Sequence, residues 1–95
     1  MPEKLVCSNN SLSDLVKWSK WGYVIILSTS STHKIFSRPE FVKLNKIVKI
    51  TLSKECECLI NEGEWPYYLI NTGCQEMQEE DLSNLNFSNM VEFTI

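Results

Sequence analysis

Reactive side chains are few in this chain, and their spacing decides which chemistry it could perform. His33 is the single histidine. Nucleophilic catalysis needs a nucleophile, a base and usually a group that orients the base. No local motif supplies such a set, so only folding could bring His33 to a cysteine and an acid. With three glycines in the chain, a glycine-rich phosphate loop is not encoded either. We therefore expect a protein that is not an enzyme and holds no cofactor.

The cysteines could bind a metal or fill a core. A C-x-C pair, Cys56 and Cys58, is too closely spaced for the usual C-x₂₋₄-C of structural zinc sites. Only Cys7, Cys74 and His33 could complete a ligand set. On a strand, Cys56 and Cys58 would share one face, and free cysteine is among the most buried residue types. We expect both to be reduced core residues, and no metal site.

Charge is strongly segregated along the chain. Residues 1–54 hold all nine basic side chains and three acids, a net charge of +6. Residues 55–95 hold nine acids and no base, a net charge of −9, so the whole chain carries −3. Such asymmetry indicates electrostatic recognition of a partner, without identifying it.

The acidic half contains the first candidate binding surface. Its members are a tight group and two acids beside a predicted turn: Glu76, Glu79, Glu80, Asp81, Glu62 and Glu64. Such a surface can occupy the basic groove of a partner protein. The alternatives are a solvated face, or pairing of the acidic strand Glu55–Glu57 with the lysines of residues 43–54. The absence of any compensating base after Lys54 favours binding.

Two tryptophans extend this candidate surface. On a helical wheel of about 100° per residue, Trp21 falls on the polar side of the first predicted helix and Trp18 on its shoulder. Exposed tryptophan is enriched at binding hot spots. Trp21 also adjoins Gly22, where the helix is predicted to end and the side chain can turn inward, so core placement is favoured over an interface for Trp21.

The basic half offers a different function. If the second predicted helix runs one further turn, Lys43, Lys46 and Lys49 cluster on one side of it. Three lysines in a row could follow a phosphate backbone. No aromatic residue is interleaved to stack on bases, and an amphipathic helix needs a polar side in any case. Nucleic-acid binding is therefore the alternative and not the preferred function.

The elements that must position these residues indicate one α+β domain over residues 1–95. We predict a mainly antiparallel sheet of four to six strands with two helices, Ser11–Trp21 and Arg38–Lys46. Helical spacing gives way to period two near Val48. The segment Gln75–Leu85 reads as a short helix or loop. The predicted strands are Lys4–Cys7, Tyr23–Leu27, Val48–Leu52, Glu55–Ile60, Trp65–Ile70 and Met90–Ile95.

Size and composition complete the expectation. No apolar run approaches the ~20 residues of a membrane span, and the N-terminus lacks an apolar signal region. We therefore expect a cytoplasmic binding protein that occupies a basic partner surface, such as an inhibitor or immunity-type protein from a virus or mobile element. The alternatives are a nucleic-acid-binding module and a subunit whose charged halves mediate self-association.

Overall fold

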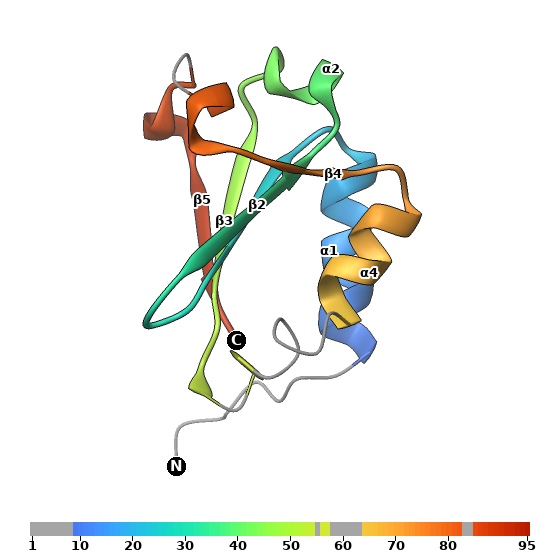
Figure 1. Ribbon diagram of the computed structural model, residues 1–95, viewed down its shortest axis with the longest axis vertical. Helices are drawn as coiled ribbons and strands as arrows, with labels where there is room; N and C mark the ends of the chain where they lie inside the picture. Colours follow the sequence, from blue (N-terminus) through green and yellow to red (C-terminus); the bar gives the residue numbers. More distant parts are fainter. Residues whose placement is uncertain (1–8, 55, 58–63, 83–84) are drawn as a thin grey trace.

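The structure is a computed structural model that describes residues 9–54, 56–57, 64–82 and 85–95. These residues form three helices and five strands, with helical backbone also at Cys56 and Glu57 (Figure 1). In chain order the elements are α1 (Asn9–Lys20), β1 (Val24–Ser28), β2 (His33–Ser37), α2 (Pro39–Val42), β3 (Ile47–Thr51), α4 (Glu64–Asn71), β4 (Gln75–Met77) and β5 (Val91–Thr94), with the 3₁₀ helices η1 (Glu79–Leu82) and η2 (Phe87–Asn89) between β4 and β5.

The five strands make one mixed sheet in the order β4-β2-β1-β3-β5. The pairings β1–β2 and β2–β4 are antiparallel, whereas β1–β3 and β3–β5 are parallel. The α+β class and the number of strands are therefore confirmed, but the sheet is less antiparallel than we predicted. Strand β2 returns the chain to the end of the sheet at which β1 begins, and the segment through α2 carries it to the other side of β1, so β3 runs beside β1 in the same direction.

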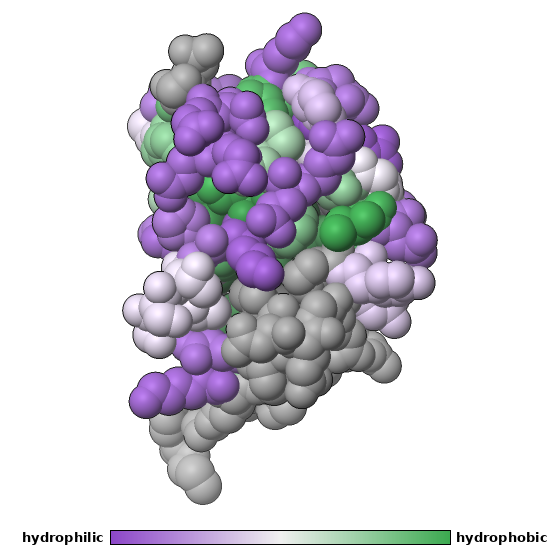
Figure 2. Space-filling model, in the orientation of Figure 1, coloured by the Kyte–Doolittle hydropathy of each residue, from purple (hydrophilic) through white to green (hydrophobic). Residues whose placement is uncertain are grey.

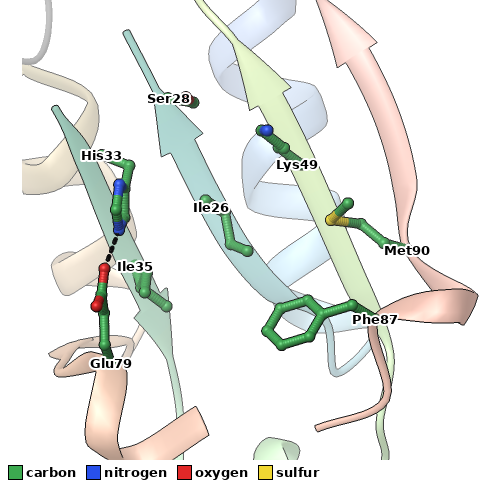
Figure 3. Close-up of a pocket in the computed structure, with 8 residues that line it drawn as sticks. All are labelled: Ile26, Ser28, His33, Ile35, Lys49, Glu79, Phe87 and Met90. Carbon is green, nitrogen blue, oxygen red and sulfur yellow. Dashed lines mark hydrogen bonds and ion pairs between the residues drawn. The ribbon is translucent and has the colours of Figure 1, made fainter. Parts of the chain in front are cut away.

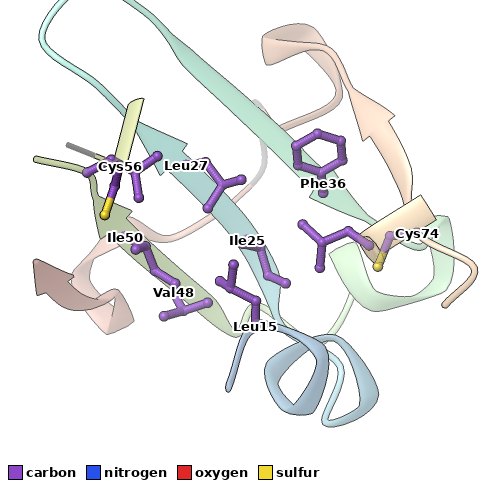
Figure 4. Packing of buried hydrophobic residues seen from close by; sticks show 10 residues of the cluster. Leu15, Ile25, Leu27, Phe36, Val48, Ile50, Cys56 and Cys74 are labelled. Carbon is purple, nitrogen blue, oxygen red and sulfur yellow. The ribbon is translucent and has the colours of Figure 1, made fainter. Parts of the chain in front are cut away.

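Strand β1 lies at the centre of the sheet, and its first four residues are buried. Its continuous apolar sequence suits a strand that is covered on both faces, and both faces are covered here. On one face, Ile25 and Leu27 join Leu15 of α1 and Leu69 of α4 in the larger core cluster. Figure 4 shows Leu15 approaching Ile25 and Val48 from the helix side. We call this side of the sheet the helix face.

The opposite face is covered by the C-terminal part of the chain. Val24 and Ile26 pack there with Ile35, Ile47 and Leu82. Because β4 and β5 are the two outer strands, the chain between them must cross the sheet. Its η1 residue Leu82 is buried in this second cluster. Both faces therefore have an apolar layer, although the second layer is the smaller one.

Several local predictions differ from the structure. The predicted strand Trp65–Ile70 is helical and belongs to α4. Cys56 lies in helical backbone instead of a strand. The second helix ends at Val42, well before the predicted Lys46, because Asn45 adopts a left-handed backbone with φ of 55°. The predicted strand Lys4–Cys7 lies outside the described residues.

Other predictions are close to the structure. The first helix, β1, β3 and β5 each begin and end within a few residues of the predicted bounds. Gly22 ends the first helix with φ of 89°, a left-handed conformation that glycine adopts without steric cost. The strand β2 was not predicted at all, and it forms a hairpin with β1 across the turn at residues 29–32.

Candidate functional site

One candidate site is the outer edge formed by β4 and η1, which we call the acidic edge and define by Glu76, Glu79, Glu80 and Asp81. Strand β4 supplies Glu76, and η1 supplies the other three. All four side chains are exposed. In the view of Figure 2, hydrophilic residues cover much of the upper part of the molecule around smaller hydrophobic areas. The fold therefore keeps the acidic group of the sequence together at the surface.

Two of these four carboxylates, those of Glu79 and Asp81, make contacts with other described residues. Glu79 Oε1 lies 2.5 Å from Nε2 of His33 on β2. Asp81 accepts a hydrogen bond of 3.1 Å from the backbone N–H of Gln78. Within the described ranges, no Lys or Arg lies within ion-pair distance of the acidic edge. The alternative considered from the sequence concerned Glu55–Glu57: Glu57 accepts hydrogen bonds from the backbone N–H and the hydroxyl of Ser30, and Glu55 lies outside the described residues.

Contacts of the Arg38 side chain with the segment just before β4 hold the acidic edge in place. The Arg38 guanidinium donates a hydrogen bond to the carbonyl of Thr72, just before β4. Its Nε is buried and has no hydrogen-bond partner. Gly73 follows Thr72 with φ of 100°, and a Cβ there would lie 3.1 Å from Arg38 Nε. Arg38 therefore packs against a backbone position that only glycine leaves open.

Cys74, which directly precedes β4, is a buried free thiol. Burial raises the pKa of the Cys74 thiol above its ordinary value, against opposing effects of a Thr72 hydrogen bond and the Arg38 charge. The thiol therefore stays protonated at neutral pH. Such a cysteine contributes packing and not nucleophilic chemistry.

The other edge of the sheet, β5, has a different character. We call it the aromatic edge and define it by Val91 and Phe93 with the neighbouring Trp18, Trp21 and Tyr23. Trp18 lies 4.6 Å from Tyr23, 5.4 Å from Trp21 and 5.8 Å from Phe93, measured between ring centroids. Trp18 is partly buried against the core. Trp21 and Phe93 are 58% and 44% exposed.

The two kinds of residue expected to bind a partner thus lie on opposite edges. The acids flank β4, whereas Trp18 and Trp21 lie near β5. Trp21 is exposed, so the expectation of core placement is wrong for it. Glu62 lies outside the described residues, and only the backbone of Glu64 is described.

The predicted lysine stripe does not form. Lys43 follows the end of α2, whereas Lys49 belongs to β3. Lys46 Nζ lies 5.9 Å from the centroid of the Tyr23 ring. Because the helix stops early, no helical face joins the three lysines. The alternative of nucleic-acid binding through a helical stripe loses its geometric basis.

A small hollow opens on the sheet face opposite the helices (Figure 3). Its volume is about 240 Å³, and its polar residues are Ser28, His33, Lys49 and Glu79. Ser28 is the register partner of His33 on the adjacent strand. Among the described contacts, His33 hydrogen-bonds Glu79 and not Ser28. Within the described residues, therefore, no hydrogen bond joins His33 to a hydroxyl or thiol.

The cysteine predictions are only partly right. Cys56 is fully buried, as expected, but it is disulfide-bonded and not reduced. Cys7 and Cys58 lie outside the described residues. Among the residues described, no group of three or more His, Cys, Asp or Glu side chains could hold a metal ion.

Sequence reasoning missed the exposed apolar residues of β5 and α4. Val91 and Phe93 belong to a strand that was predicted, but its position at an edge was not. Tyr67, Tyr68 and Ile70 are exposed on α4, whose helical nature was missed. A helical wheel drawn for residues 64–71 would have placed aromatic residues on a polar side.

Comparisons with known proteins identify no relative. No protein-family model, curated protein or solved structure matches the chain. No helix among the described residues is long and apolar enough to cross a membrane.

Proposed function

We propose that this protein is a small binding module that works by occupying a basic surface of a partner protein with its acidic edge. One observation supports this above all. Four exposed carboxylates lie within residues 76–81, and no described Lys or Arg neutralises them. A carboxylate group without counterions projects a negative potential that attracts basic partners.

The expected action is steering and occupancy, not chemistry. Exposed charges accelerate encounter and select partners more than they prolong the complex. A module of this size and acidity suits an inhibitor or immunity-type role, of the kind that viruses and mobile elements encode, and we propose that role within the cytoplasm. Among the described residues, the disulfide at Cys56 argues against a reducing compartment.

Glu76 and Glu80 allow the sharpest test. Neither carboxylate has a hydrogen bond or ion pair in the structure, so charge reversal there leaves the contacts of Glu79 and Asp81 intact. The partner is first captured from nuclease-treated lysate and identified. Its association with the Glu76→Lys/Glu80→Lys variant should be slower than with the native protein by about tenfold at low salt. The dissociation rate should change less.

Lysine reversal provides the matched control. Lys43→Glu/Lys46→Glu changes the same number of charges at exposed positions and should leave association unchanged or faster. The difference between the two variants should shrink with added salt, because the screening length falls to about 8 Å at physiological ionic strength. Loss of capture after nuclease treatment, or slowing by the lysine variant alone, would overturn the proposal in favour of nucleic acid.

A further inference from the structure

Among the described residues, the outer strand β5 pairs with β3 on one side and with no strand on the other. We propose that β5 pairs antiparallel with β5 of a second copy of this chain, with a two-fold axis at Phe93. The result is a ten-stranded sheet across a symmetric dimer. This inference concerns the aromatic edge and is independent of the acidic edge at the other side of the sheet.

The hydrogen bonds of Ile95 show which groups face outward. Its N–H donates to the Thr51 carbonyl at 2.9 Å, and its carbonyl accepts from Ser53 N–H at 2.7 Å. In a strand, successive residues direct their backbone groups to opposite sides. Val91 and Phe93 therefore also bond toward β3, whereas the N–H and C=O groups of Glu92 and Thr94 point away from the sheet.

The outward groups restrict the register of a symmetric antiparallel pair. An axis at Glu92 would place two like charges directly opposite each other, which is destabilising. An axis at Thr94 would place the outward groups of Glu92 beyond the end of the partner's β5, which the structure bounds at Thr94. An axis at Phe93 places Glu92 opposite the partner's Thr94, and each of these two pairs can exchange two backbone hydrogen bonds.

The same register also matches the side chains. Val91, Phe93 and Ile95 alternate with Glu92 and Thr94, so they share the helix face of the sheet. Across the axis Val91 lies opposite the partner's Ile95, and Phe93 lies opposite the partner's Phe93. Val91 and Phe93 are both exposed in one copy, and pairing would cover them. In this register apolar side chains face apolar ones, no like charges lie opposite each other, and the outward backbone groups pair, so β5 is complementary to itself, which favours a second copy over an unrelated strand.

Outer strands of stable monomers are usually protected by charge, proline or a bulge. Strand β5 has neither proline nor any charge but Glu92, whose register neighbour on β3 is Lys49. Its pairing with β3 is regular over four residues. Apart from Glu92 and its short length, β5 therefore carries none of the usual devices that prevent pairing with another chain.

Charge placed at Thr94 tests the register. Thr94 is exposed and its neighbour on β3 is the uncharged Thr51. Thr94→Lys places a lysine opposite the partner's Glu92 twice and should tighten the dimer. Thr94→Glu creates two like-charge pairs and should weaken it. We expect the two dissociation constants to differ on the order of ten- to a hundredfold, measured by sedimentation equilibrium.

Two further variants complete the design. Glu92→Lys/Thr94→Glu restores opposite charges and should recover the tight dimer, whereas Glu76→Lys on the acidic edge should have no effect. Amide exchange at Glu92 and Thr94 should slow as protein concentration rises. A native protein that stays monomeric up to about 1 mM, or equal dissociation constants for Thr94→Lys and Thr94→Glu, would overturn the inference. Neither outcome bears on partner binding by the acidic edge.

Discussion

One row of side chains runs across the helix face of the sheet from the outer strand β4 to the outer strand β5. The residues at the two ends of this row differ in character. On the helix face, the register aligns Glu76 of β4 with Phe36, Ile25, Val48 and finally Val91 of β5. The middle of this row is fully buried. At one end, the charged carboxylate of Glu76 disfavours pairing of β4 with another strand. At the other end, the exposed apolar side chain of Val91 favours such pairing of β5. The row shows that a sheet can protect one edge and leave the other open.

The edges also differ in what holds them. Around β4, the hydrogen bond from Arg38 to Thr72, the buried Cys74 and the helix α4 all contribute contacts. Around β5, every residue of the strand is exposed, and support comes from the ladder with β3 and from Trp18. Charge repulsion and local anchoring therefore coincide on the acidic edge, and both are weak on the aromatic edge.

The largest expected effect is a difference in stability loss between substitutions in the buried middle of this row and at its exposed end on β5. Phe36→Ala removes a fully buried ring and should lower the free energy of unfolding by about 3–5 kcal/mol. Val91→Ala at the exposed end should cost about 1 kcal/mol or less. Urea denaturation of dilute protein measures both. Similar losses for the two variants would contradict the burial pattern on which the comparison depends.

An intermediate effect tests the anchoring of the acidic edge. Gly73→Ala forces an L-residue into a positive φ and places its Cβ against Arg38. We expect a loss of about 2–4 kcal/mol, because strain adds to a weakened hydrogen bond to Thr72.

Gly22→Ala is the matched control for this prediction. Its φ is also positive, but the nearest atom to the new Cβ is a terminal methyl of the half-exposed Leu44, which can move. For Gly22→Ala, the loss in free energy of unfolding should be close to that caused by backbone strain alone, about 1–2 kcal/mol. A greater loss at Gly22 than at Gly73 in the same urea titration would show that Arg38 does not anchor the edge.

The smallest effect concerns Cys74 under the acidic edge. Because burial raises the pKa of the thiol in the folded state, the neutral form is the one that folding favours. The corresponding stability is complete below the pKa of the unfolded thiol and is lost as pH rises above it. Between about pH 8 and 10, spanning the ordinary thiol pKa of about 8.5, native protein should therefore lose slightly more stability than Cys74→Ala.

Reactivity provides an independent readout of the same thiol. At pH 8, iodoacetamide should modify Cys74 in the folded protein more slowly than in urea-unfolded protein, by at least about tenfold. Equal rates would place the thiol in contact with solvent and remove it from the buried support of β4.

The sequence by itself determined the elements whose signals are local. The first helix follows from its spacing and from Gly22, and β1 follows from a continuous apolar run that both faces bury. The charge segregation is likewise a property of the sequence, because no base follows Lys54. Within the described residues, the grouping of four acids at residues 76–81 survives folding because they are adjacent along the chain.

Only the tertiary structure decided which segments form the outer strands of the sheet and which side chains lie beside them. Aromatic residues of 65–70 favour a strand in isolation, but helix α4 buries Leu69 against the core, and this burial outweighs local preference. Likewise, the strand order separates the acids from Trp21 and exposes Phe93. Strand order follows from pairings between segments distant in sequence, and local spacing carries no information about them. That is why the acidic surface was predictable, whereas the open strand β5 was not.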